Sequence, residues 1–170
     1  DVKKSCIDLL SISSHKFHGP KGVGILYKNK NVRLIPLIIG GGQQNDLRSG
    51  TLNVPGIVGT KVAAEIAYKN IENYVDYLKM LKEYLINLLV SLDEKYHIIL
   101  VNTKNNDNFS PHIVSISFKG IRAEVMLHAL EENEIYVSAG SACSSHDKKT
   151  SNTLISIGLA QDIAESTIRV

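Results

Sequence analysis

The chain is organised around the stretch Leu9–Gly24, which reads LLSISSHKFHGPKGVG. An apolar, strand-like run ends abruptly in hydroxyls, an imidazole and a lysine, and a turn punctuated by Gly and Pro follows. A second apolar run begins at Gly24, so the pattern predicts a β-hairpin. Lys16 would lie at the end of a buried strand, between small polar residues, where its amine could form an imine with an aldehyde cofactor.

Composition and charge indicate an ordinary globular protein. Of 170 residues, 44% are hydrophobic and 21% are charged, and the formal net charge is +2. These fractions are typical of a globular domain, and the lysines are scattered, so no nucleic-acid partner is indicated. No apolar run approaches the ~20 residues that span a bilayer, and no signal segment opens the chain.

Both ends of the chain look cut, since it does not begin with Met and stops on Ser166–Val170 without a capping signal. We therefore expect an excerpt of a longer, cytoplasmic protein. The two cysteines, Cys6 and Cys143, are far apart in sequence, and a disulfide between them is not expected in the cytosol. No C-x-x-C pair and no ligand-like grouping of His with carboxylates is present, so no metal site is predicted.

Hydrophobic periodicity predicts a mixture of helices and strands along the rest of the chain. Strands are expected at residues 7–12, 24–27, 32–39, 97–101, 112–118 and 135–137. Helices are expected at 122–133 and 153–159, and residues 164–170 open a final helix or strand. A long helix is predicted from about 54 to 94, with a break near Asn70–Asn73 and a core-facing stripe that includes Tyr74, Leu78, Leu81, Leu85, Leu88 and Leu92. The order strand, strand, helix, strand behind it indicates a small α+β domain.

A triple glycine, Gly40–Gly42, precedes the polar run Asp46–Asn53. Glycines suit a backbone that bends tightly or that approaches a ligand or another chain closely. A flexible surface loop is the alternative interpretation, and composition alone leaves the two open.

Lys16 is the first candidate for chemistry. A free lysine amine has a pKa near ~10.4, and it becomes a nucleophile or imine partner when burial or nearby cations lower that pKa. Ser13 and His15 offer donors that could hold a phosphate beside it. The alternative is a solvated lysine in a turn. A phosphate-binding loop at Gly19–Gly24 is not supported, because the motif's Lys followed by Ser or Thr is missing and a strand follows instead of a helix.

Cys143 is the second candidate, since it lies among Gly and Ser on an expected loop, the setting of an accessible thiol. A nucleophilic role needs thiolate character from a nearby base or cation, and His146 three residues later does not by itself make a dyad. An incidental loop cysteine is the alternative. Arg48 and Arg169 are the remaining candidates, because a guanidinium can clamp a carboxylate or phosphate through two hydrogen bonds.

Taken together, four segments in order resemble the cysteine desulfurases, which are pyridoxal-phosphate enzymes of aminotransferase class V. These segments are Ser13–Gly24, Gly40–Gly59, Ser138–Ser145 and Ser166–Arg169, and they span almost the whole chain. The resemblance implies an α/β fold of the fold-type I PLP-transferase class. Residues 1–60 would be the C-terminal part of the large cofactor-binding domain, residues 61–95 a long linking helix, and residues 96–170 a small, truncated α+β C-terminal domain.

The resemblance also implies roles residue by residue. Lys16 would hold pyridoxal 5'-phosphate through an imine, and Ser13 and His15 would contact its phosphate. Thr51 would contact the phosphate of the neighbouring subunit, which implies a homodimer with shared sites. Arg169 would bind the carboxylate of the substrate, L-cysteine.

Cys143 would attack the substrate sulfur and leave as a persulfide. A sulfur-acceptor or scaffold protein would then receive the sulfur for iron–sulfur cluster or other sulfur-cofactor synthesis. The small-residue loop around Cys143 resembles the subgroup associated with iron–sulfur assembly and nitrogenase maturation. Thr150 departs from the family, which commonly has Pro there, so the loop after Cys143 is expected to be laxer.

The family's upstream half, which supplies an aspartate that faces the pyridine nitrogen and a histidine that stacks on the ring, is absent here. We therefore expect the piece alone to bind the cofactor weakly or not at all and to show no turnover. Two alternatives of the same fold are a selenocysteine lyase and a cysteine sulfinate desulfinase. A non-catalytic sulfur-relay scaffold is the alternative of a different class.

Overall fold

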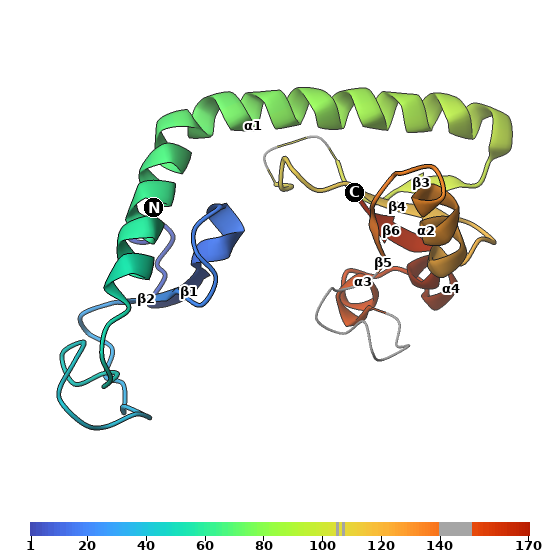
Figure 1. The fold of residues 1–170 in the computed structure, drawn as a ribbon. Helices are drawn as coiled ribbons and strands as arrows, with labels where there is room; N and C mark the ends of the chain where they lie inside the picture. The colour runs from blue at the N-terminus through green and yellow to red at the C-terminus, as the bar shows by residue number, and fades with distance from the viewer. Residues whose placement is uncertain (105, 107, 140–150) are drawn as a thin grey trace. The chain divides into compact units, whose positions relative to one another are not determined.

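The structure is a computed structural model that describes residues 1–104, 106, 108–139 and 151–170. The chain divides into two compact units, Asp1–Ile71 and Glu72–Val170, and each is described by itself. The longest helix, α1 (Val54–Tyr96, 43 residues), begins in the first unit and ends in the second (Figure 1). The domain limits expected at residues 60 and 95 stay a prediction.

The first unit contains the predicted hairpin. Strand β1 (Leu9–Ser13) pairs antiparallel with β2 (Gly24–Lys28), in a register that runs from Leu9 opposite Lys28 to Ser13 opposite Gly24. A short 3₁₀ helix, η1 (Ser14–Phe17), follows β1 directly. The hairpin expected from the apolar pattern is therefore confirmed, and the sequence between its strands holds a turn of helix.

The strand expected at residues 32–39 is wrong. No strand is assigned there, and Ile35 and Leu37 are 91% and 97% exposed. Isolated strands are not stable, because their backbone N–H and C=O groups need a paired neighbour. In the described part of the first unit, the only paired strands are β1 and β2. The backbone of residues 32–39 therefore has no neighbouring strand with which to form hydrogen bonds.

The glycine-rich loop contains a left-handed turn. Gln44, Asn45 and Asp46 have φ values of 55°, 56° and 61°, and the Asp46 N–H donates to the Gly42 carbonyl at 3.2 Å. Three consecutive left-handed residues are unusual, because this conformation crowds the Cβ of an L-residue. The loop also closes on itself, since the Gly50 N–H donates to Gln43 Oε1 at 3.0 Å.

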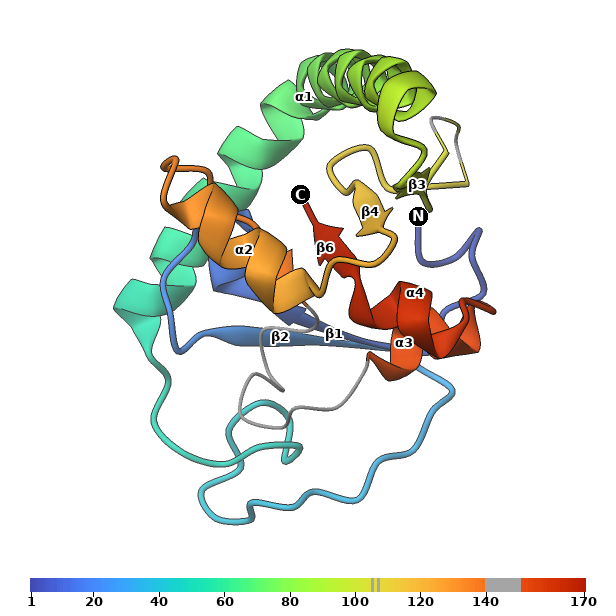
Figure 2. The same cartoon turned by 90° about the vertical axis from the view of Figure 1, so that its right-hand side faces the viewer.

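The second unit is a four-stranded antiparallel sheet covered by helices. Its strand order is β3-β4-β6-β5, with bounds β3 (Ile99–Val101), β4 (Ser115–Phe118), β5 (Ser138–Ala139) and β6 (Thr167–Arg169). Helix α2 (Ala123–Glu131) lies beside the sheet, and α3 (Asn152–Ser156) and α4 (Gln161–Glu165) precede β6 (Figure 2). The predicted mixture of strands and helices is confirmed.

The core of the second unit lies on one face of this sheet. Its central cluster of buried apolar side chains consists of Leu89, Val114, Ile116, Ala123 and Ile168. Ile116 and Ile168 are directly opposite each other on β4 and β6, Leu89 comes from α1 and Ala123 from α2. The alternation along β4 therefore turns Ile116 toward the helices, and Ser115 and Ser117 toward the opposite face.

The structure has one helix over Val54–Tyr96, without the expected interruption, but the boundary between the two compact units, after Ile71, falls at the place where the break was expected. Asn70 is accommodated because its side-chain Nδ2 donates to the Ile66 carbonyl one turn earlier, at 3.0 Å. Such a bond gives the side-chain amide a partner within the helix, four residues earlier. Among the described residues, no helix combines the length and apolar character that a membrane span requires.

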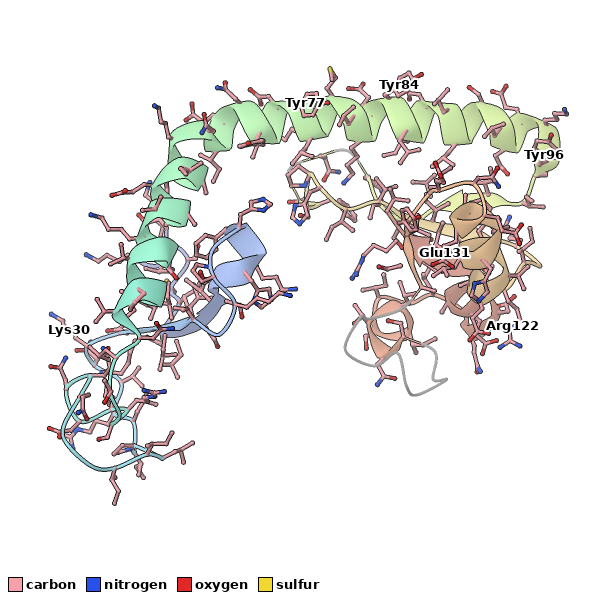
Figure 3. The ribbon with its side chains drawn as sticks, viewed as in Figure 1. Lys30, Tyr77, Tyr84, Tyr96, Arg122 and Glu131 are labelled. Carbon is pink, nitrogen blue, oxygen red and sulfur yellow. The ribbon has the colours of Figure 1, made fainter. Side chains whose placement is uncertain are left out.

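The expectation that the Leu and Tyr stripe faces the core is wrong for most of its members. Tyr74, Leu81 and Leu88 are 57%, 40% and 46% exposed, and Figure 3 shows Tyr77 and Tyr84 on the same helix, also exposed. A helix packed against one sheet face buries only a narrow side. That side carries Leu89, with Leu85 and Ile86 partly buried beside it.

Two further predictions near the C-terminus need correction. Residues 135–137 are not a strand, because the Ile135 N–H donates to the Leu130 carbonyl and Glu134 has a φ of 60°, which together close the end of α2. Pairing begins instead at Ser138, opposite Arg169. The segment 164–170, expected as helix or strand, contains both, the end of α4 and then β6.

Candidate functional site

The turn that carries Lys16 presents three candidate side chains to solvent. Lys16 and His15 lie in η1, Ser13 ends β1, and all three are exposed. Lys16 is therefore delivered at the end of a strand, as predicted. The strand is not buried as expected, because its residues alternate between exposed and half-buried in the hairpin.

Ser14 is a residue that the sequence reasoning missed. Its side chain is completely buried, whereas its neighbours Ser13 and His15 are exposed. Its hydroxyl lies 2.8 Å from that of Thr60 on α1. Nothing in a run of two serines tells which one points inward, and the partner is 46 residues away, so the sequence held no signal for it.

Thr51 is exposed in the loop that precedes α1. It follows Gly50, whose N–H is tied to Gln43. No hydrogen bond between described residues joins Thr51 to Lys16, so the structure leaves its role as the resemblance implied it. Arg48 is also exposed, and it stays a candidate only.

Arg169 lies on β6 in the second unit, and it is exposed. It pairs with Ser115 on one side and with Ser138 on the other. Paired residues point to the same face of a sheet, so the arginine stands on the polar face, opposite the core. Cys143 and the rest of the loop 140–150 lie outside the described residues.

A directed chain of hydrogen bonds crosses the polar face beside Arg169. Thr167 Oγ1 donates to the Ile163 carbonyl at 2.7 Å, which uses its only proton. Ser117 must then donate to Thr167, at 2.7 Å, and accept from Asn102 Nδ2, at 2.8 Å. This order fixes the orientation of the Asn102 amide. Asn102 Oδ1 is left buried without a hydrogen-bond partner.

Lys82 is a buried cation on α1, within the second unit. It is 3% exposed, and its Nζ donates to the Ser110 carbonyl at 2.8 Å, with the Phe109 ring centroid 5.8 Å away. Burial lowers the pKa of Lys82 below its ordinary value, because the charged form loses hydration. Its contacts tie the helix to the loop before β4.

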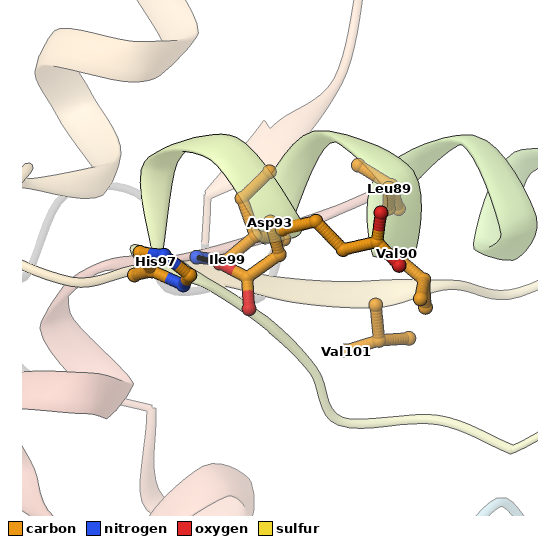
Figure 4. A pocket seen from close by; sticks show the side chains of 7 residues that line it. Leu89, Val90, Asp93, His97, Ile99 and Val101 are labelled. Atoms are coloured by element: carbon orange, nitrogen blue, oxygen red, sulfur yellow. Dashed lines mark hydrogen bonds between the residues drawn. The ribbon is translucent and has the colours of Figure 1, made fainter.

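A shallow pocket of about 460 Å³ lies between the end of α1 and β3 (Figure 4). Its lining residues are Leu89, Val90, Asp93, Glu94, His97, Ile99 and Val101. None of the predicted site residues is among them. Asp93 accepts the Ile99 N–H at 2.7 Å, so one carboxylate of the pocket serves to fix the strand. In the part of the chain that the structure describes, no three His, Cys, Asp or Glu side chains gather to hold a metal.

The donors of the Lys16 turn fit pyridoxal phosphate. An exposed amine suits the aldehyde carbon, and an exposed hydroxyl and imidazole on the same turn suit the phosphate oxygens. Thr51 adds a further exposed hydroxyl in the same unit. The first unit therefore supplies an amine for the aldehyde and donors for the phosphate of this cofactor.

The chain belongs to the aminotransferase class-V family, whose sequence pattern matches residues 1–169. Within that family, the similar curated proteins carry narrower names. A NifS/IcsS protein homolog of Lactobacillus delbrueckii subsp. bulgaricus is 39% identical over 99% of this chain and 43% of its own length. The cysteine desulfurase IscS of Rickettsia rickettsii is 40% identical over 99% of this chain and 40% of its own length.

Solved structures give the same result. A NifS-like protein matches all of this chain and 42% of its own, with a TM-score of 0.83 and 38% identity. The NifS-like protein from Rickettsia africae matches all of this chain and 43% of its own, with a TM-score of 0.82 and 30% identity. The α/β fold class expected from the resemblance is confirmed. The chain spans only about two fifths of the length of these relatives.

Proposed function

We propose that this chain forms part of a pyridoxal-phosphate-dependent cysteine desulfurase, which converts L-cysteine to L-alanine and transfers the sulfur to Cys143. The observation that carries the proposal is the Lys16 turn, on which an amine, an imidazole and a hydroxyl are exposed together at a strand end. Two relatives that match the whole chain carry the names cysteine desulfurase and NifS/IcsS homolog, which supports the same assignment.

The residues of the first unit would hold the cofactor. Lys16 would hold its aldehyde carbon and would move the proton at the substrate α-carbon, while Ser13 and His15 would hold the phosphate. When bound, pyridoxal phosphate supplies an electron sink for the bonds at that carbon. Thr51 contacts the phosphate in the neighbouring subunit, so the active protein is a homodimer.

The remaining residues handle the substrate. The Arg169 guanidinium binds the carboxylate of L-cysteine through paired hydrogen bonds, and its exposure on β6 leaves it free to do so. The Cys143 thiolate attacks the substrate sulfur. A sulfur–sulfur bond forms, the carbon–sulfur bond of the substrate breaks, and protonation of the three-carbon remainder gives L-alanine. Cys143 is left as a persulfide.

The persulfide is then passed to an acceptor or scaffold protein for iron–sulfur cluster or other sulfur-cofactor synthesis. We place this chemistry in the cytoplasm, where thiols stay reduced. Within this chain, the other thiol is that of Cys6. Cys6 is exposed and free.

The test uses the natural protein that contains this chain, with Lys16→Ala and Cys143→Ala variants. We expect alanine to form from L-cysteine in the unchanged protein, and mass spectrometry to find one added sulfur on Cys143. Lys16→Ala should abolish both results, because the amine is lost. Cys143→Ala should abolish alanine formation from L-cysteine, while Cys6→Ala serves as the matched thiol control and leaves it unchanged.

Two outcomes would contradict the proposal. If Cys143→Ala kept full activity on selenocysteine and the unchanged protein did not act on L-cysteine, the protein would be a selenocysteine lyase. If Cys143 carried sulfur from a donor protein but no alanine formed with the cofactor bound, the chain would be a sulfur relay.

A further inference from the structure

Ser14 holds the Lys16 turn against helix α1 through a directed hydrogen bond. Thr60 Oγ1 donates to the Gly56 carbonyl at 2.8 Å, so its only proton is used. The Ser14 hydroxyl, 2.8 Å from Thr60 Oγ1, must therefore be the donor in that pair. Both residues are buried, with 0% and 6% of their surface exposed, so the bond between them is shielded from bulk solvent.

The backbone of Ser14 ties the same turn to the hairpin. Its N–H donates to the Val23 carbonyl at 3.1 Å, and its carbonyl accepts the Gly19 N–H at 3.0 Å. The His18 N–H also donates to this carbonyl, and His18 has a left-handed φ of 66°. Ser14 is thus held through both its side chain and its backbone, and it lies one residue from His15 and two from Lys16.

Glycines allow the turn and the helix to lie this close. A Cβ on Gly19 would collide with Ser14 Oγ, and one on Gly59 would lie 2.9 Å from the ring of Pro20. Contacts under 3.0 Å are not tolerated by real Cβ atoms without a shift. The first turns of α1 therefore pack closely against the segment that follows Lys16.

We propose that Ser14 and Thr60 are positioning residues for Lys16. With Ser14 held inward, a 3₁₀ turn of three residues places Phe17 on the same side, and Phe17 is half-buried. His15 and Lys16 are left on the outer side. The pair thereby fixes where the amine and the imidazole point before a cofactor arrives. This inference rests on the proposed function of Lys16 as the cofactor lysine.

The test compares Ser14→Ala, Thr60→Val and the double variant in the natural protein that contains this chain. Loss of one buried hydrogen bond should weaken retention of pyridoxal phosphate about two- to tenfold. The double variant should lose no more than Thr60→Val alone, because both changes remove the same bond. Thr60→Ser keeps the hydroxyl and should restore retention. Ser91→Ala is the matched control, since it removes an exposed hydroxyl-to-carbonyl bond from the same helix.

A second readout does not need the cofactor. Hydrogen exchange of the His18 and Gly19 N–H groups, both bonded to Ser14, should accelerate in Ser14→Ala and Thr60→Val without cofactor. The Met126 N–H in α2 should not change, because it lies in the other unit.

The outcomes separate the two proposals. Faster exchange with unchanged cofactor retention would mean that the pair only stabilises the fold, and the positioning role would be wrong. Unchanged exchange would show that the pair does not hold the turn at all, which also overturns it. If Lys16→Ala retained the cofactor as well as the unchanged protein, the proposed function would fail instead, whatever the exchange data show.

Discussion

At the scale of single residues, burial more than residue type determines how strongly a polar side chain depends on its hydrogen-bond partner. Ser13 and Ser14 are chemically identical neighbours, yet one is exposed and the other fully enclosed. Lys82 is likewise one of many lysines, but it is the one whose pKa is lowered by burial among the described groups. Enclosed groups depend on their partners, so substitutions at them have larger and more specific effects.

The buried ammonium of Lys82 predicts a pH-dependent stability. Its pKa is lowered in the folded state and returns to 10.5 on unfolding, so between those two values the unfolded state binds more protons. Stability should then rise with pH across that window, and the full burial cost should be present below it. We expect the urea midpoint of the unchanged protein, relative to Lys82→Met, to increase from neutral pH toward about 10.5.

Lys95→Met is the control for this measurement, because Lys95 is exposed and its Nζ lies 5.0 Å from the Tyr96 ring centroid. The same pH trend for Lys82→Met and Lys95→Met would show that the trend does not come from burial of the Lys82 amine.

At the scale of elements, hydrogen bonds hold β6, the strand of Arg169, in place. The chain from Asn102 through Ser117 and Thr167 to the Ile163 carbonyl has a fixed direction. Breaking it in the middle leaves a buried proton without an acceptor, whereas removing an end group does not. The position of a residue within this series of hydrogen bonds should therefore determine how much unfolding free energy is lost when the residue is replaced.

Thr167→Val should cost about 1–3 kcal/mol of unfolding free energy, because Ser117 then has no acceptor for its proton. Ser166→Ala should cost only about 0.5–1.5 kcal/mol. It too removes a hydroxyl that donates to the Ile163 carbonyl, at 2.8 Å, but no other bond depends on it. Urea unfolding monitored by circular dichroism measures both. Equal losses would mean that the order of donors carries no energetic weight.

The sequence predicted the elements that have local signals. The hairpin of β1 and β2 and the helix α2 follow from alternation and helical spacing, and the structure has both. Residues 32–39 failed because β-propensity cannot supply a partner strand. The stripe with Leu81 and Leu88 failed for a related reason, since periodicity identifies an apolar face but not what covers it.

The candidate site was predicted from four motifs in order along the sequence. Lys16, Ser13 and His15 are exposed on one turn, and Arg169 is exposed on a strand. Cys143 lies outside the described residues. The residue that sequence reasoning could not find is Ser14, because its role depends on a helix residue far along the chain.

At the scale of the whole molecule, a large apolar surface is uncovered. Ile35, Leu37 and Ile39 are 91%, 97% and 81% exposed, and burying one such side chain stabilises by about 1.5–3 kcal/mol. The relatives have more than twice the length of this chain. Such exposed stretches mark sites of association.

We expect the 170-residue chain alone to self-associate, because no described residue covers Leu37 or Ile39. Light scattering over a concentration series should show a rising mass, and Leu37→Lys with Ile39→Lys should lower it. Lys30→Glu, a change of charge at the edge of the same loop, is the control. A mass that stayed that of one chain at every concentration would contradict the expectation.

The left-handed turn at Gln44–Asp46 has a consequence for how this loop evolves. The conformation costs about 1–2 kcal/mol for an ordinary side chain such as that of Gln44, whereas Asn45 and Asp46 are residue types that adopt it more readily. A strained conformation persists where the surrounding structure, or a bound molecule, stabilises it by more than the strain costs. Gln43 begins this turn and receives the Gly50 N–H, next to Thr51. In a lineage that no longer needed Thr51, Gln44 would be among the first residues to drift toward glycine.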